Sequence, residues 1–459
     1  MTLIRNYVDN QATLIKNNNS NNSKNPVFEI VRGNSLYSRY IFSVDLVPLR
    51  NKLINEYGIT SGNVSTQVIK FYNSINLRND LIGKQNVDGF FRDNNFELQL
   101  FKIDENFTNG TSYNYNYSLN LTPNNIEVPN WYYKDKVNTW IESGIYTGNT
   151  VPNILATQFL TQGNENLEFD ITNTLINVLY NSTATTLNLG ISYTADYENS
   201  ITGNTESNYI VSFFSKYTQT FFEPCIETTT NDIIIDDRIK FYLDEPNKLY
   251  LYPNKPITGI DKVEIFDYND DVILTLSGNS ITKLNNNVYY INLVISSTDY
   301  PDMVNFTDKW YYKDINNKSK IYSQEFTLLT DENFLNNEEE SYLNSKFYFS
   351  TFGINNNETI SQSEKKRRVQ VITKRLFNSI IEDNIPVDHL QYRIYILQGS
   401  TQIEIIPFTN INKTFINNYF DIDIESLIPQ TYYIEIKLDY NGITLSDTKS
   451  IKFKIASEK

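Results

Sequence analysis

Residues 262–278 read KVEIFDYNDDVILTLSG, and this stretch decides the fold class. Val263 and Ile265 alternate with charged residues, the polar sequence DYNDD follows, and a second apolar run begins at Val272. Such alternation places apolar side chains on one face of a strand, and a polar turn between two such runs predicts a β-hairpin. The stretch therefore predicts an all-β fold.

The composition of the whole chain agrees with this prediction. Aromatic residues make up 14% of the 459 residues, only 16 residues are glycine, and the patterned stretches are rich in Ile, Val, Thr, Tyr and Phe. These residue types suit a pleated, half-buried surface. Asparagine clusters, such as residues 17–22 and 354–357, supply turn residues. A chain of this length has room for about three domains.

The charge balance narrows the range of partners. The chain has 39 basic and 54 acidic residues, a net charge of −15, which repels duplex DNA and anionic membranes. The longest apolar runs fall short of the roughly 20 residues that a membrane-spanning helix needs. The first residues include no apolar signal segment. With a single cysteine, Cys225, no intrachain disulfide can form, and we expect folding in a reducing cytoplasm.

The patterns predict four segments. Residues 1–28 contain a polar tract and are expected to form a flexible N-terminal arm, with a tether that orders on a partner as the alternative. Residues 29–230 are expected to form a jelly-roll-like β-sandwich. We expect an immunoglobulin-like domain plus an acidic linker over residues 231–345. We expect a C-terminal immunoglobulin-like domain over residues 346–459.

Two strand-to-helix units support the division of the first block. YIFSVDL (40–46) and NLEFDIT (166–172) alternate apolar residues, end in Asp45 and Asp170, and run into short helices. A carboxylate at that position can accept hydrogen bonds from the free N–H groups of the first helical turn.

The later blocks show shorter strands. KLYLYP (248–253), VYYINLVIS (288–296) and KSKIYSQEFTLLT (318–330) join the hairpin in a pattern typical of an immunoglobulin-like sandwich. LIPQTYYIEI (427–436) resembles the entry to the penultimate strand of fibronectin-type and immunoglobulin-like domains. This resemblance implies that the Tyr432 hydroxyl bonds back to the preceding corner.

The sequence WYYKD occurs twice, at residues 131–135 and 310–314. The neighbours of the two copies do not match, so we interpret the repeat as a coincidence of strand and turn chemistry and not as a duplicated domain. In the second copy, Trp310 and Tyr312 are expected on the same face of a strand.

Several stretches of the first block carry a family resemblance, in the same order along the chain: FELQLFKI (96–103), the Trp131 and Trp140 pair, NLEFDIT (166–172) and VSFFSKYTQTFFEPCIETT (211–229). Together they resemble DNRLRE-type jelly-roll modules, which occur on bacterial surface proteins and in phage virion proteins. The arginines of the motif that names the family are replaced here, with FFSKY at residues 213–217.

Two sets of residues are candidates for binding. The first is a basic run in EKKRRVQVITKR (364–375), with Lys365, Lys366, Arg367, Arg368, Lys374 and Arg375. It predicts either an electrostatic dock for an acidic subunit, a solvated strand paired with the acidic residues 338–340, or a nucleic-acid contact. The second set is a candidate glycan platform of Trp131, Tyr132, Trp140 and Tyr146, for which core packing is the favoured interpretation.

Catalytic chemistry has little support in the sequence. His389 is the only histidine and Cys225 the only thiol. A carboxylate pair among acids such as Glu165, Glu168 and Asp170 would suffice for a glycosidase, but solvated strand faces explain these residues better. We therefore expect no enzyme, no cofactor and no metal site.

A string of sandwiches, the DNRLRE-type resemblance and an abundance of residues with AT-rich codons resemble the structural proteins of crAss-like tailed phages of gut Bacteroidota. This resemblance implies a virion protein, made in the host cytoplasm, that acts as a head-attached fibre or capsid decoration protein. Its implied partners are itself, as a homodimer or homotrimer, and the major capsid or other virion proteins. The alternatives are a neck, tail-ring or tail-fibre component, and a carbohydrate-binding adhesin.

Overall fold

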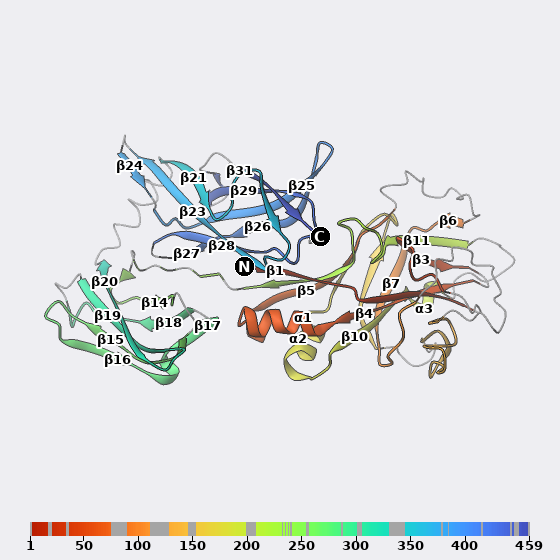
Figure 1. Cartoon of the computed structure of the whole chain (residues 1–459), viewed down its shortest axis with the longest axis horizontal. Coiled ribbons are helices and arrows are strands. Elements are labelled where there is room, and N and C mark those ends of the chain that lie inside the picture. Colours follow the sequence, from red (N-terminus) through yellow and green to blue (C-terminus); the bar gives the residue numbers. More distant parts are fainter. Residues whose placement is uncertain are drawn as a thin grey trace. The chain divides into compact units, whose positions relative to one another are not determined.

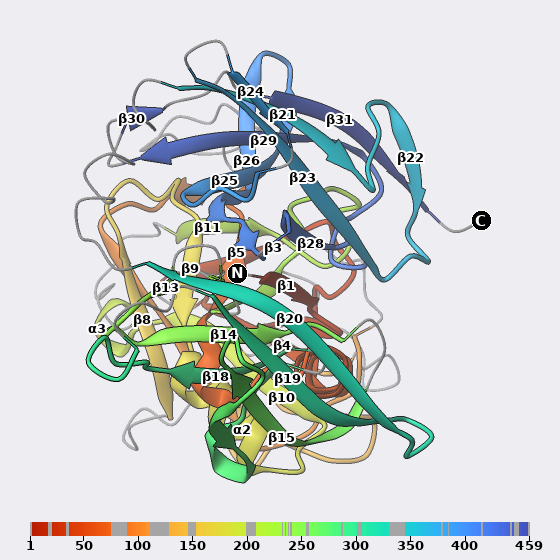
Figure 2. The same ribbon diagram turned by 90° about the vertical axis from the view of Figure 1, so that its left-hand side faces the viewer.

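The computed structural model describes residues 2–16, 21–33, 36–74, 90–110, 128–145, 153–198, 208–231, 233–234, 236, 238, 241–253, 257–285, 288–300, 305–329, 345–377, 380–383, 385–414, 416–440, 443–444 and 449–457. The chain divides into two compact units. The N-terminal unit contains residues 4–53 and 64–229, and the C-terminal unit contains residues 1–3, 54–63 and 230–459. Strands dominate both units (Figures 1 and 2).

The described strands of the N-terminal unit form three sheets (Figure 1). The five-stranded sheet has the order β2 (Asn10–Ile15), β4 (Ser38–Asp45), β10 (Thr186–Tyr193), β7 (Phe96–Ile103) and β8 (Ile154–Leu160). The four-stranded sheet has the order β1 (Thr2–Tyr7), β12 (Cys225–Thr230), β5 (Val64–Phe71) and β9 (Leu167–Asp170). The three-stranded sheet has the order β3 (Val27–Arg32), β11 (Asn208–Phe214) and β6 (Phe90–Arg92).

Aromatic side chains join these sheets in a common core. Tyr40 and Phe42 of β4 meet Phe71 of β5 edge-on, with ring centroids 5.9 and 5.2 Å apart. Phe28 of β3 stacks on Tyr40 at 3.6 Å. Because these rings come from all three sheets, the sheets pack face to face as a sandwich, with the aromatic rings excluding water between them.

The two expected strand-to-helix units are present. Helix α1 (Leu46–Arg50) continues as a π-helical turn (Asn51–Glu56), and α2 (Thr172–Asn181) follows β9. The N–H of Val47 donates to Asp45 at 2.9 Å, and the N–H of Thr172 donates to Asp170 at 2.9 Å. The prediction that these carboxylates accept N–H groups at the helix starts is therefore confirmed, with Asp45 as the N-cap of α1 and Asp170 one residue before Ile171, the N-cap of α2. The described residues also form four short helical turns: α3 (Ala195–Glu198), η2 (Ser61–Asn63), η4 (Ser143–Ile145) and η5 (Gly278–Ser280).

The structure corrects the expectation of a flexible arm over residues 1–28. Within this segment, β1 lies beside β12 and β2 pairs with β4. Ile4, Ala12 and Leu14 are buried, and in the described part of the polar tract, residues 21–25, Asn21 Nδ2 donates to the carbonyl of Pro129 at 2.8 Å. A hydrogen-bond partner more than 100 residues away in the sequence thus satisfies a polar side chain in a segment that is too polar to order by itself.

The first immunoglobulin-like sandwich lies in the C-terminal unit. One sheet has the order β13 (Phe241–Tyr242), β20 (Ser319–Leu329), β19 (Asn305–Asp314), β15 (Ile257–Phe266) and β16 (Val272–Leu276). The other has the order β14 (Asn247–Leu251), β18 (Val288–Leu293) and β17 (Thr282–Asn285). Leu249, Val263, Ile291 and Trp310 come from both sheets and share one buried cluster, which makes the two sheets a sandwich.

A buried ion pair lies inside this sandwich. Arg238 Nη2 is 3.1 Å from Asp308 Oδ2, and the indole Nε1 of Trp310 donates to the same oxygen at 2.6 Å. Arg238 also donates to the carbonyl of Tyr250 at 2.9 Å. Burial raises the pKa of Asp308, although Arg238 and Trp310 act in the opposite direction. These contacts hold Arg238 against Tyr250 of β14 and Asp308 of β19.

The second immunoglobulin-like sandwich ends the chain. One sheet has the order β21 (Lys346–Phe352), β23 (Lys366–Phe377), β28 (Asn418–Asp423) and β27 (Asn412–Lys413), with β24 (Ile380–Asp383) also paired to β23. The other has the order β22 (Glu358–Ser361), β31 (Lys449–Ala456), β29 (Thr431–Tyr440), β25 (Leu390–Gln398) and β26 (Thr401–Asn410), with β30 (Ile443–Thr444) paired to β29. The Tyr432 hydroxyl donates to the carbonyl of Ile428 at 2.9 Å, which confirms the expected tyrosine corner.

The expected fold class is confirmed: the protein is all-β, with an N-terminal jelly-roll-like sandwich followed by two immunoglobulin-like sandwiches. The two WYYKD copies have different structures. Residues 131–135 lie in a loop with a single bridge from Tyr133 to Thr139, whereas residues 310–314 end strand β19. The repeat is therefore not a duplicated domain.

Candidate interaction surfaces

The loop of residues 128–145, between β7 and β8, carries the tryptophans that the sequence singled out. Trp131 and Trp140 are both buried. They pack in one cluster with Ala12, Leu14, Ile41, Phe101 and Ile103. The two indole rings thus attach the loop to the outer side of the five-stranded sheet, and η4 (Ser143–Ile145) is the one helical turn described within the loop.

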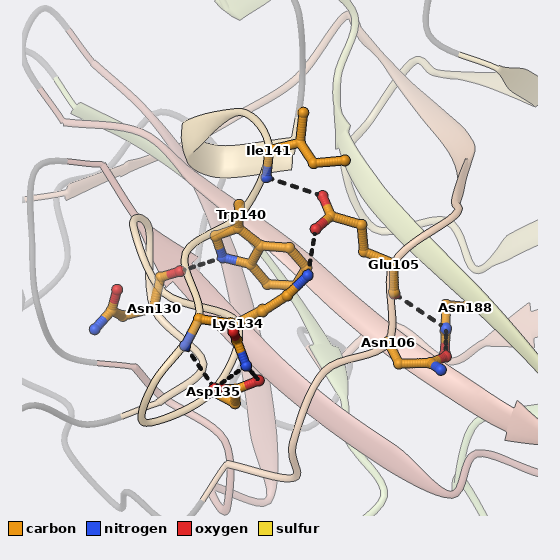
Figure 3. Close-up of polar contacts among 9 residues, drawn as sticks. Glu105, Asn106, Asn130, Lys134, Asp135, Trp140, Ile141 and Asn188 are labelled. Carbon is orange, nitrogen blue, oxygen red and sulfur yellow. Dashed lines mark hydrogen bonds and ion pairs between the residues drawn. The ribbon is translucent and has the colours of Figure 1, made fainter.

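Glu105 lies beside this loop and binds it at two points (Figure 3). One of its carboxylate oxygens accepts the N–H of Ile141 at 3.1 Å, and the other pairs with Lys134 Nζ at 2.8 Å. The indole N–H of Trp140 donates to the carbonyl of Asn130 at 2.8 Å. These bonds satisfy the polar groups of a segment that lacks a strand partner along most of its length.

Asp135 closes the tip of the same loop. Its carboxylate accepts the N–H groups of Val137 at 2.8 Å and Asn138 at 2.7 Å. Hydrogen bonds from the Asn138 side chain and from these two N–H groups lower the pKa of Asp135. The side chains of Val137 and Ile141 project into solvent from this fixed backbone. Single exposed aliphatic residues of this kind are common on protein surfaces.

The glycan-platform hypothesis is wrong for Trp131 and Trp140, because buried rings cannot stack on a sugar. Core packing, the favoured interpretation, is confirmed for both. Tyr132 is half-buried against the same cluster, and Tyr146 lies outside the described residues.

Three cations of the basic run, Lys366, Arg367 and Arg368, are paired within their own domain. Arg368 binds Asp421 through two bonds of 2.8 and 3.0 Å, and Lys366 lies 3.1 Å from the same carboxylate. Arg367 pairs with Glu364 at 2.8 Å. Burial acts to raise the pKa of Asp421, but Arg368 and Lys366 hold it below its ordinary value. Asp421 lies on the neighbouring strand β28, so the pairing is part of the sheet.

The other three cations of the run, Lys365 at its start and Lys374 and Arg375 at its end, are not part of the pairing with Asp421 and Glu364. Lys365 and Lys374 are exposed, and Arg375 is half-buried and donates to Ser345 at 2.9 Å. The acidic residues 338–340, proposed as their partners, lie outside the described residues. Docking of an acidic subunit on the run stays a prediction, with Lys365 and Lys374 as its accessible cations.

An apolar surface that the sequence analysis did not single out lies on the outer side of the same sheet, where β21, β23 and β24 are neighbours (Figure 2). Tyr348, Phe352 and Ile381 are 50%, 69% and 67% exposed. Lys346 and Lys374 flank them, Lys374 directly opposite Tyr348 in the register. We call these five residues the β21 face. The sequence KFYFSTF (346–352) indicates this surface, because aromatic residues occupy both faces of the strand and only one face can be buried in the sandwich.

The hairpin between β15 and β16 carries a second exposed feature, the hairpin tip, defined here as residues 267–272. Asp267 is buried and accepts the N–H groups of Asn269 and Asp271 at 2.9 Å each. Tyr268 and Val272 are 72% and 50% exposed. The Asp270 side chain is 85% exposed, and its carboxylate lies 3.7 Å from Lys309 Nζ. The tip is a fixed turn with an acidic and apolar surface.

The three acids considered for carboxylate-pair chemistry have separate roles. Glu165 accepts the N–H groups of Thr161 and Gln162, and these bonds outweigh burial and lower its pKa to about 2. Glu168 lies 3.6 Å from Lys70, and Asp170 accepts the N–H of Thr172, the first residue of α2. Each acid is explained by its local structure.

The remaining candidate groups are structural as well. Cys225 is buried, and burial raises the pKa of its thiol to about 12. His389 has a φ of 60° in a turn, and its carbonyl accepts the N–H of Asp439 at 3.2 Å. Among the described residues, no group of three or more His, Cys, Asp or Glu side chains could hold a metal ion. No helix in the described part of the chain is long and apolar enough to cross a membrane.

Comparison with known proteins gives distant similarities only. No protein-family model matches the chain, and no curated protein matches it. Among solved structures, the fibronectin(III)-like modules of Clostridium thermocellum CbhA are similar at 8% identity and a TM-score of 0.16, covering 49% of this chain and 91% of that one. A DUF4785 family protein from Legionella pneumophila is similar at 11% identity and a TM-score of 0.17, covering 97% and 93%. A tetra-tandem repeat from the extending region of a large adhesion protein is similar at 9% identity and a TM-score of 0.16, covering 99% and 93%. The fold assignment therefore rests on the sheets described above.

Proposed function

We propose that this chain is a non-enzymatic structural protein of a bacteriophage virion, a head-attached fibre or capsid decoration protein that assembles with itself and with the capsid. The observation that carries the assembly part of this proposal is the β21 face. Tyr348, Phe352 and Ile381 lie exposed on one side of a well-packed sheet. Large apolar side chains gathered on a flat face mark subunit contacts more often than catalytic clefts.

The internal ion pairs also support a mechanical role. Glu227 of β12 lies between Arg5 of β1, at 2.5 Å, and Lys70 of β5, at 2.7 Å. Arg5 and Glu227 are nearly buried, and the cluster ties three neighbouring strands across the sheet. Like Arg238 and Asp308 in the first immunoglobulin-like sandwich, these charged groups stabilise strand packing. A protein that presents rigid modules in an assembly needs this property.

The virion part of the proposal is supported by the resemblance of the first block to DNRLRE-type modules and of the whole plan to crAss-like phage structural proteins. A neck, tail-ring or tail-fibre position in the same particle fits these observations equally well. Trp131 and Trp140 were the strongest candidates for a glycan-binding surface, and both are buried. This burial weakens the adhesin alternative.

Electron cryomicroscopy of intact particles tests this proposal. We expect density for the three sandwiches on the head, in contact with the capsid protein. Density on the tail or neck would replace the head assignment, and absence from particles would overturn the virion role. A glycan array probed with the purified full chain should be blank, whereas saturable binding to one glycan class would favour the adhesin.

A further inference from the structure

Strand β16 is the last strand of the five-stranded sheet in the first immunoglobulin-like sandwich (Figure 1). It pairs with β15 along one side, and no backbone hydrogen bond from another part of the described chain reaches Val272–Leu276. Alternate N–H and C=O groups of the strand therefore face away from β15. This is the arrangement to which a further strand can add.

The residues of β16 do not protect this edge. Its sequence, VILTL, contains no charged residue and no proline, the residue types that discourage an edge strand from pairing with another chain. Each other edge strand of more than two residues that is described in the two immunoglobulin-like sandwiches contains a charged residue: Lys248 (β14), Lys283 (β17), Lys346 (β21), Glu358 (β22), Glu382 (β24) and Glu404 (β26). Among these edges, β16 is therefore the one open to strand addition.

The hydrophobic core is also incompletely covered at this edge. Val263 and Ile265 of β15 are fully buried, whereas Leu276 and Leu274, directly opposite them in the register, are only half-buried against the same core cluster. The sheet that contains β16 has five strands and the facing sheet has three. A strand added beyond β16, with apolar side chains on its core-facing side, would remove more of both leucines from water.

An antiparallel copy of β16 has the side chains that this edge needs. Residues directly opposite each other in an antiparallel pair lie on the same face of the sheet. If two copies of the strand pair about Thr275, Leu274 of each copy lies opposite Leu276 of the other on the core-facing side. Thr275 then lies opposite its own counterpart on the exposed side. One strand thus serves as both partners, as a two-fold contact requires.

The same register keeps the acidic residues of the two hairpin tips apart. Asp271 precedes Thr275 by four residues, so the two-fold axis places the tips at opposite ends of the strand pair. At about 3.3 Å per residue, Asp271 of one copy is roughly 26 Å from Asp271 of the other, well beyond the Debye length of about 8 Å at physiological ionic strength. Glu264, which lies opposite Thr275 on β15, is bound by Lys262. Charge repulsion at the contact itself is therefore weak.

We propose that two copies of the chain pair antiparallel through strand β16, with Thr275 on the two-fold axis, so that their five-stranded sheets join into one continuous sheet. The backbone of β16 supplies the hydrogen bonds, and Leu274 and Leu276 of both copies cover the edge of the core. This inference rests on the proposed function and deepens it, by naming a surface through which copies assemble.

Cysteine cross-linking of the full chain tests the register. Directly opposite Cα atoms in an antiparallel pair are about 4.5–5.5 Å apart, which lies within the range that a disulfide spans. Thr275 is exposed and the native Cys225 is buried, so Thr275→Cys supplies the one accessible thiol. We expect mild oxidation to convert this variant to a covalent dimer on a non-reducing gel. Val294→Cys, at an exposed position just after β18 of the same sandwich, is the control and should stay monomeric.

Charge substitution at the same residue tests the two-fold symmetry. Sedimentation velocity would compare the wild type, Thr275→Lys, Thr275→Glu and a 1:1 mixture of the two variants. Each variant alone places like charges opposite each other on the axis and should lose about tenfold or more in association constant. The mixture places opposite charges there and should regain association. Val294→Lys should associate like the wild type, and circular dichroism of each variant reports whether the sandwiches remain folded.

Salt dependence gives an independent readout for the wild type. The strand contains no charge, but each copy carries a net charge of −15, so the two copies repel each other as they approach. Added salt screens this repulsion and should strengthen the association.

The outcomes are decisive in both directions. A wild type that stays monomeric at all concentrations, equal cross-linking of the two cysteine variants, or a mixture that fails to regain association would overturn the β16 pair. If the chain is found on particles but its association ignores the Thr275 variants, this inference fails and the proposed function stands. If copies pair through β16 but the chain is absent from particles, the proposed virion function fails and the pair stands.

Discussion

Arg39 of β4 and Glu198 of α3 face each other inside the N-terminal unit, joined by hydrogen bonds of 2.9 and 2.7 Å. Their side chains are 3% and 4% exposed. Arg39 also donates to the carbonyl of Gly144 at 2.9 Å, so the same guanidinium holds the loop of residues 128–145. The pair therefore connects a sheet, a helical turn and an irregular loop that are far apart in sequence.

Replacement of Glu198 by Gln should destabilise the N-terminal unit strongly. The change leaves Arg39 buried without a counter-charge, a situation that costs about 3–5 kcal/mol of unfolding free energy. Urea denaturation of the full chain measures the loss. The control is Glu142→Gln, which changes an exposed carboxylate in the loop of residues 128–145. This control should change the free energy of unfolding by no more than about 0.5 kcal/mol. Equal effects of the two variants would contradict a structural role for the buried pair.

Gly144→Ala should loosen the tryptophan loop. Gly144 has a φ of 74°, and an added Cβ would lie 2.4 Å from the Trp131 ring. Backbone strain and the clash together should cost about 2–4 kcal/mol. Gly278→Ala is the control, because its φ of 58° brings the strain but no heavy atom lies within 4 Å of the new group. Tryptophan fluorescence should shift to longer wavelength in the first variant and stay unchanged in the second; a shift in both would argue against the clash.

Tyr432→Phe should destabilise the C-terminal sandwich by about 1–2 kcal/mol. The change removes the hydroxyl that donates to the Ile428 carbonyl and leaves that carbonyl without its side-chain donor. Tyr433→Phe, one residue further on the opposite face of β29, serves as the control and should be nearly neutral. Thermal unfolding monitored by circular dichroism distinguishes them. If the two variants unfold at the same temperature, the hydrogen bond of the tyrosine corner contributes nothing to stability.

Because of Glu223, we expect the free energy of unfolding to fall as the pH rises from about 5 to 7. Burial raises the pKa of Glu223 from 4.5 to about 7, with Lys216 acting in the opposite direction. Between these pH values the folded chain therefore binds a proton that the unfolded chain has released, and raising the pH removes the stabilisation. Glu223→Gln should lack this component, so its stability relative to the wild type should increase across that range in urea denaturation.

For Glu165 we expect the opposite pH dependence of the free energy of unfolding. The pKa of Glu165 is lowered to about 2, because hydrogen bonds to its carboxylate outweigh the effect of burial. Its contribution is present above the ordinary pKa of 4.5 and is lost as the pH falls toward 2. Glu165→Gln should therefore lose stability relative to the wild type at neutral pH and approach it in acid. Parallel pH profiles for the wild type and both variants would contradict these assignments.

Local chemistry explains what the sequence could predict. Strand β7 occupies the expected residues 96–103, Asp45 and Asp170 accept N–H groups at the starts of their helices, and the Tyr432 hydroxyl forms its corner bond. Each of these features depends on residues within a few positions of one another, where alternation, capping and turn chemistry act directly.

Long-range pairing explains what the sequence could not predict. Asn21, in the polar tract that was expected to be part of a flexible arm, is held by Pro129, more than 100 residues away. Arg368 is bound by Asp421, which follows 53 positions later and becomes its neighbour only through the register of β23 and β28. The β21 face was missed because its exposure depends on which side of the sheet the second sandwich layer covers.

The burial of Cys225 makes this protein unusually easy to label. Its sulfur is out of reach of solvent and its thiolate is scarce at neutral pH, since its pKa is about 12. Maleimide reagents should therefore leave the folded native chain unmodified. A cysteine introduced at an exposed position, for example Val137→Cys, becomes the sole reactive point, so a fluorophore or gold cluster can be attached at one chosen place without first removing the native thiol.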